Sequence, residues 1–142
     1  MLSFFVSGRP QPEAKKRIRR GETQWHRPRI HRYDDDGSKR GWMENVRLCA
    51  RKAINKQKVK MIPAGVGVTV DYHFYFRRAK SNKHDAMVIK PDESRLIEAI
   101  DDALENVCYE NDMQINCHLV KTEYTFANQV EGVMIEVYET VR

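Results

Sequence analysis

The sequence lacks any long uninterrupted run of apolar residues. No stretch approaches the roughly 18 consecutive apolar residues that a membrane-spanning helix requires. Its apolar beginning, MLSFFVSG, is too short for the core of a secretory signal peptide and has no basic leader. We therefore expect no membrane association and a cytoplasmic location.

Cysteine is also scarce. The chain has three cysteines, Cys49, Cys108 and Cys117, which is an odd number without a CxxC pair. This argues against a disulfide framework and favours buried free thiols in a reducing compartment. Cys108, Cys117 and His118 also lack the spacing of zinc ligands, so we expect no structural zinc.

Apolar residues are nevertheless frequent enough to build a folded core. Hydrophobic residues make up 41% of the 142 residues, which argues against disorder. A chain of this length buries roughly two-thirds of its unfolded surface on folding. Since there are no repeats and no linker, we expect a single domain covering residues 1–142.

Charge is distributed unevenly along the chain. Residues 1–60 carry 17 Lys/Arg against 6 Asp/Glu, a net charge of +11, while residues 61–142 carry 8 against 14, a net charge of −6. This pattern predicts a polyanion-binding surface beside a group of carboxylates. The simpler alternative is a solvated surface whose charges happen to be uneven.

The region from Gly8 to Arg40 shows no periodicity. It has three prolines and seven arginines before Tyr33, which cannot form a core. We interpret it as a basic loop or arm, at about residues 9–40, that becomes ordered on a ligand.

The remaining sequence alternates between strand and helix patterns. Apolar positions between Trp42 and Ile54 have helical spacing, and the segment from Val66 to Phe76 alternates with period two. The full predicted order is a strand at Leu2–Val6, that first helix, the alternating strand, a basic loop at Arg77–Lys90, a helix at 92–107, and strands at Ile115–Phe126 and Val133–Glu139. The fold class is therefore α/β (α+β): a mixed sheet of about four strands flanked by two main helices.

Carboxylates occur at the start of the second helix and at a later turn. Asp92 follows Pro91, where it can be a helix N-cap. On spacing alone, we expect the stripe formed by Ser94, Glu98, Asp101 and Glu105 to be solvated. The alternative is a metal site, because hydrolysis of a phosphodiester with Mg²⁺ requires carboxylates that converge on the ion, and Asp112 precedes a predicted strand.

Several segments, taken in order, resemble one family. FFVSGRPQP, GWMENVRLCARKA, VGVTVDYHFYFRR, KPDESRLIEAIDDALENVCYENDMQI and VEGVMIEVYE resemble the opening strand, first helix, long strand, signature and closing strand of RusA-type Holliday junction resolvases. The resemblance covers nearly the whole chain, and the span from Lys-Pro-Asp to Asp-x-Gln-Ile is its most specific part.

This resemblance implies a homodimeric α/β endodeoxyribonuclease that uses Mg²⁺ to nick two opposing strands of a four-way DNA junction symmetrically. It carries metal-binding and catalytic roles to Asp92 and Asp112, and the source would be a bacterium or a phage-infected host. The second aspartate of the family signature is replaced here by Ser94, and a family lysine by Glu98. Because residues four apart are neighbours on a helix, we hypothesise that Glu98 supplies the missing metal-binding and catalytic carboxylate. The sequence leaves open whether Mn²⁺ replaces Mg²⁺, and no small-molecule cofactor is expected.

Basic residues are the predicted DNA contacts. Lys and Arg side chains that neutralise phosphates give affinity that falls with salt and reads few bases. The predicted contacts are Lys15, Lys16, Arg17, Arg19, Arg20, Arg77, Arg78, Lys80, Lys83 and Lys90.

Two other functions fit some of these features. One is a catalytically impaired DNA-binding protein on the same fold, since the Asp-to-Ser exchange leaves the usual three-acid site incomplete. The other is an RNA-binding domain, which accommodates the basic arm but leaves the carboxylates unexplained.

Overall fold

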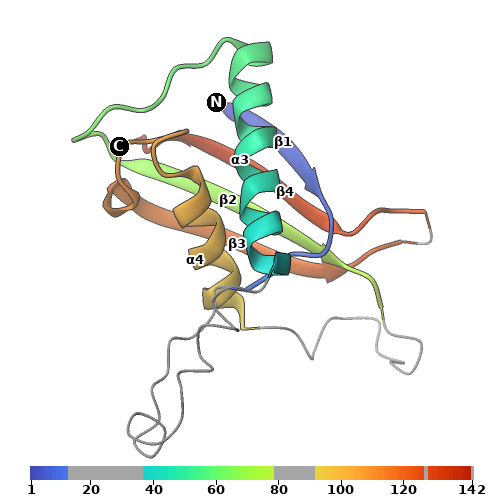
Figure 1. The fold of residues 1–142 in the computed structure, drawn as a ribbon. Helices are drawn as coiled ribbons and strands as arrows, with labels where there is room; N and C mark the ends of the chain where they lie inside the picture. Colours follow the sequence, from blue (N-terminus) through green and yellow to red (C-terminus); the bar gives the residue numbers. More distant parts are fainter. Residues whose placement is uncertain (13–36, 79–91, 127, 142) are drawn as a thin grey trace, which may run out of the picture.

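The computed structural model describes residues 1–12, 37–78, 92–126 and 128–141. These residues form two α-helices, one short 3₁₀ helix and four strands (Figure 1). In chain order the elements are β1 (Leu2–Ser7), α3 (Gly37–Gln57), β2 (Val68–Phe76), α4 (Glu93–Leu104), η1 (Asp112–Gln114), β3 (Ile115–Tyr124) and β4 (Gly132–Glu139). The predicted fold class, with two helices and a mixed four-stranded sheet, is confirmed.

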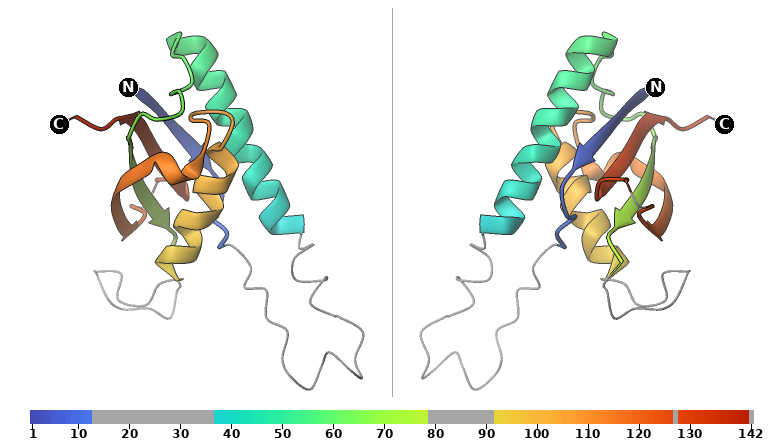
Figure 2. Two further views of the ribbon diagram at one scale, coloured as in Figure 1. Left: turned by 90° about the vertical axis from the view of Figure 1, so that its left-hand side faces the viewer. Right: turned by 90° about the vertical axis from the view of Figure 1, so that its right-hand side faces the viewer.

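The sheet has the strand order β1-β4-β2-β3. β4 is antiparallel to both of its neighbours, whereas β2 and β3 are parallel. The crossovers through α3 and α4 therefore join parallel strands and proceed in the same direction across the sheet. Since such crossovers are nearly always right-handed, both helices lie on the same face of the sheet, as Figure 2 shows.

The core fills the space between this face and the two helices. Alternation along β2 directs Val70, Tyr72 and Phe74 toward the helices, where all three are fully buried. The helices contribute the buried side chains Trp42, Val46, Ala50, Ala53, Leu96, Ile100 and Leu104. The helical and period-two patterns of the sequence are thus both confirmed as core-facing patterns.

The predicted end of the second helix is wrong by three residues. Val107 continues the apolar spacing of the helix, but α4 ends at Leu104, and Asn106 adopts a positive φ of 66°. Asparagine tolerates this left-handed conformation better than most residues, so it reverses the chain. Val107 is buried after the turn. Among the described residues, no helix is long and apolar enough to cross a membrane.

Candidate functional site

Asp92 is the N-cap of α4, as expected. Its Oδ1 accepts hydrogen bonds from the Ser94 backbone N–H at 3.1 Å and from the Ser94 hydroxyl at 2.7 Å. The Ser94 hydroxyl is the main cause that lowers the pKa of Asp92, and the backbone N–H groups of Ser94 and Arg95 contribute further. The residue that replaces the family's second aspartate therefore acts here as a donor that favours the ionised Asp92.

Glu98 lies one and a half turns further along α4. Its carboxylate pairs with Arg95, with 3.4 Å between Oε2 and Nη1, and its side chain is 52% exposed. Such exposed pairs contribute little energy, so this contact does not hold Glu98 firmly. The hypothesis that Glu98 replaces the missing acid stays a prediction.

Asp112 is positioned by a capping box around η1. Asn111 is the N-cap, and the Gln114 side chain accepts a hydrogen bond from the Asn111 backbone N–H at 2.8 Å. The amide nitrogen of Gln114 donates to the carbonyl oxygens of Pro63 at 2.7 Å and Val66 at 3.0 Å. The turn that carries Asp112 is therefore fixed to the segment that precedes β2.

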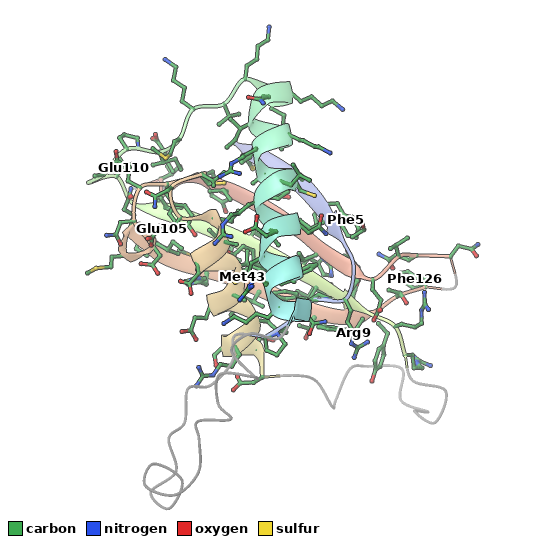
Figure 3. The ribbon with its side chains drawn as sticks, in the orientation of Figure 1. Phe5, Arg9, Met43, Glu105, Glu110 and Phe126 are labelled. Carbon is green, nitrogen blue, oxygen red and sulfur yellow. The ribbon has the colours of Figure 1, made fainter. Side chains whose placement is uncertain are left out.

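Asp112 lies at the end of α4 that is remote from Asp92. Its backbone N–H donates to Oε2 of Glu105 at 3.0 Å, and Glu105 is the C-cap of α4 (Figure 3). A helix rises about 1.5 Å per residue, so roughly 18 Å separates the two ends of α4. Mg²⁺ binds its ligands at about 2 Å, so two carboxylate oxygens on one ion lie within about 4 Å of each other.

One chain therefore does not bring the two family acids onto a single ion. The described ranges also contain no group of three or more His, Cys, Asp or Glu side chains that could hold a metal together. Asp92 and Asp112 of one chain are thus not brought together, and the metal-binding roles of Asp92, Glu98 and Asp112 stay predictions.

A separate hydrogen-bonded cluster surrounds Asp101. Its carboxylate accepts the Tyr72 hydroxyl at 2.6 Å and pairs with Nε2 of His118 at 2.8 Å, and only 14% of its side chain is exposed. Burial raises the pKa of Asp101, the hydrogen bonds from Tyr72 and His118 oppose this rise, and the negative charge of Asp112 adds to it. The expectation of a solvated acidic stripe is thus wrong at Asp101, because this residue turns toward the sheet.

The partners of Asp101 do not follow from the spacing of residues along the helix. One available signal was Tyr72, since a tyrosine at a core-facing strand position requires a hydrogen-bond partner for its hydroxyl. The pairing of Val70 with His118 across the parallel strands then brings the imidazole to the same face. The position of His118 beside Asp101 thus depends on the register between β2 and β3, which the sequence pattern alone does not give.

We predict that Asp101→Asn is at least as stable as the wild type at pH 7 to 8. A raised pKa means that the folded state binds the proton more tightly than the unfolded state, so wild-type stability falls as pH rises through the pKa of Asp101. The difference in melting temperature should disappear below the unfolded pKa of about 4. Thermal unfolding across pH measures it, with the exposed Glu98→Gln as control. A wild-type advantage at pH 8 contradicts the prediction.

The cysteines agree with the expectation of free thiols. All three are free, Cys108 is buried, and burial raises its pKa to about 12. Cys49 and Cys117 are only partly buried, so the expectation of complete burial is wrong for these two. A thiol with such a pKa is a weak nucleophile, so Cys108 is a packing residue.

The predicted DNA contacts are only partly within the described structure. Arg77 and Arg78 follow β2 directly, and the guanidinium of Arg78 lies 5.0 Å from the centre of the Tyr124 ring. Outside the described residues are Lys15, Lys16, Arg17, Arg19, Arg20, Lys80, Lys83 and Lys90.

Comparison with known families decides the assignment. The sequence model of endodeoxyribonuclease RusA matches residues 7–138, which is nearly the whole chain. The chain belongs to the endodeoxyribonuclease RusA family. The RusA match confirms the resemblance found in the sequence, and a search of curated proteins found no match.

Membership of the RusA family indicates the general function of the chain. RusA proteins are endodeoxyribonucleases that act on Holliday junctions, so the chain is a nuclease whose substrate is branched DNA. The match does not favour the alternative of a catalytically impaired DNA-binding protein. Asp92 immediately precedes α4, and Asp112 is the first residue of η1, which follows α4 in the chain.

Proposed function

We propose that this RusA protein is a homodimer that resolves four-way junctions by Mg²⁺-dependent, symmetric nicking of two opposing strands. The observation that carries the proposal is the position of Asp92 and Asp112 at opposite ends of α4. Each chain then offers two half-sites and no complete site.

Two-fold symmetry can combine these half-sites. In an isologous dimer, every contact between the two chains occurs twice, related by the two-fold axis. If the two α4 helices run antiparallel across the axis, the end that carries Asp92 in one copy faces the end that carries Asp112 in the other. Two equivalent sites result, which matches the need to cut two strands.

In the proposed site, Asp92 and Glu98 of one copy and Asp112 of the second copy would hold the ion. Mg²⁺ would polarise the scissile phosphate and lower the pKa of an attacking water. Ser94 keeps the Asp92 carboxylate ionised by donating to Oδ1, which leaves Oδ2 as the oxygen not used by that pair of bonds. The weak contact with Arg95 lets Glu98 turn toward the ion.

The basic residues supply affinity for the DNA backbone. Arg77 and Arg78 follow β2, and their positive charges can contact backbone phosphates. Together with the basic arm, they should give junction binding that weakens steeply with salt.

The direct test uses a labelled immobile four-way junction. With Mg²⁺ we expect paired nicks at symmetric positions in two opposing strands, and with EDTA we expect binding without nicks. The Asp112→Asn protein provides the control for contaminating nucleases. Binding in Mg²⁺ without nicks at any pH would rule out the proposed activity.

A further inference from the structure

The turn between β3 and β4 presents an exposed aromatic side chain. Phe126 is 77% exposed, although phenylalanine is normally buried. The turn itself is held by hydrogen bonds: the Phe126 N–H donates to Oε1 of Gln129 at 3.1 Å, and the Gln129 N–H donates to the Phe126 carbonyl at 3.0 Å. The backbone that carries the exposed Phe126 side chain is thus held by two hydrogen bonds.

The base of this turn is tied to the end of β2. The Thr125 N–H donates to the Phe76 carbonyl at 3.0 Å, which continues the pairing of β3 with β2 by one residue. Oε2 of Glu131 accepts from the Arg77 backbone N–H at 2.7 Å and from the Arg9 guanidinium at 2.8 Å. Three segments distant in sequence therefore meet beside the turn.

Two arginines near this turn each lie over an aromatic ring. Arg9 lies 5.4 Å from the centre of the Phe76 ring, and Arg78 lies 5.0 Å from that of Tyr124. Figure 3 shows Arg9 and Phe126 at the same end of the sheet. Glu131 pairs with Arg9, and the basic side chains beside this turn are groups that can contact a polyanion.

We propose that Phe126 stacks on a DNA base that is unpaired or unstacked at the branch point of a junction, while Arg9, Arg77 and Arg78 contact the neighbouring phosphates. Aromatic side chains among cations are the usual support for single-stranded bases, because each base offers a flat face. The proposal rests on the proposed function only in taking branched DNA as the ligand, and it does not require cleavage.

This arrangement would contribute to selectivity for branched DNA. A base in an intact duplex is already stacked on both sides, so Phe126 gains nothing from it without unstacking the helix. At the crossover of a junction, a base face is accessible at a lower free-energy cost of unstacking. Phe126 should therefore strengthen junction binding much more than duplex binding.

The test compares binding of junction and matched duplex in EDTA, with 2-aminopurine at the branch point as a fluorescent reporter of unstacking. Phe126→Ala should weaken junction binding at least about fivefold, leave duplex binding nearly unchanged and remove the fluorescence change. Phe126→Trp should retain junction preference. Val130→Ala, which truncates another exposed apolar residue after the same turn, is the matched control.

The outcomes separate this proposal from the proposed function. Wild-type junction preference and fluorescence in Phe126→Ala would overturn the stacking role, even if Mg²⁺-dependent cleavage is present. Absence of junction binding by the wild type would overturn it as well. If the wild type fails to cleave junctions but Phe126→Ala loses selectivity for them, the result would support stacking and refute the nuclease proposal. Unchanged melting temperatures should accompany each result, since Phe126 lies outside the core.

Discussion

The Asp92→Asn protein is expected to fold, to bind four-way junctions and to lose at least about 100-fold in cleavage rate. The substitution removes the charge that a divalent ion needs but keeps the oxygen that caps α4, since asparagine is as good an N-cap as aspartate. Gel analysis of nicked products over time in Mg²⁺ gives the rate, and thermal unfolding tests the cap.

Two comparisons separate loss of the ligand from loss of the helix cap. Asp92→Ala removes both, so it should match Asp92→Asn in activity but unfold at a lower temperature. Glu123→Gln removes a carboxylate that pairs with His73 and Lys121, and this variant should cleave at the wild-type rate. If Asp92→Asn cleaves within a few-fold of the wild type, Asp92 does not bind the catalytic ion.

Patterns within a single element were sufficient to predict the two α-helices, the four strands and their buried faces. They did not predict η1, and α3 begins at Gly37, inside the arm expected to extend to about residue 40. The alternation from Val66 to Phe76 identified the strand that the structure places at Val68–Phe76, because each second side chain must enter the core. Helical spacing identified the buried residues Val46 and Ala50 in the same way. These predictions succeed since they depend only on local periodicity and on the burial of apolar surface.

Element ends and side-chain partners required information that the pattern lacks. Val107 fits the helical spacing of α4, yet Asn106 turns the chain before it. Asp101 belongs by spacing to the acidic stripe, but Tyr72 and His118 hold it against the sheet. Both cases depend on a backbone conformation or a strand register, and neither follows from hydrophobic periodicity.

The sequence named residues for the candidate site, and their metal-binding roles stay predictions. The resemblance assigned these roles to Asp92 and Asp112, and the match over residues 7–138 confirms the family. Convergence was expected because one acid lies at a helix start and the other at a turn before a strand, which are rigid positions for metal ligands. The rise of α4 separates them within one chain instead, so the proposed site depends on the arrangement of the proposed dimer.

A mixed dimer tests this arrangement directly. We expect a dimer of one Asp92→Asn chain and one Asp112→Asn chain to cleave, although each parent dimer is inactive. In the proposed assembly, one site of the mixed dimer contains Asp92 from the second chain and Asp112 from the first, and it is intact. The other site lacks both acids. The mixed dimer should therefore nick one strand of a junction and leave the opposing strand uncut.

Sites built within single chains give the opposite result. Each chain of the mixed dimer lacks one acid, so neither site would be complete and the dimer would be as inactive as its parents. Co-expression with two different affinity tags and sequential purification isolates the mixed dimer, and a doubly tagged Asp92→Asn dimer is the control. Since random mixing of the parents yields half mixed dimers, each with one intact site, unsorted mixtures should recover about a quarter of wild-type nicking. Recovery from two inactive proteins requires that the two acids act across the dimer, because no exchange of chains can repair a site that one chain builds alone.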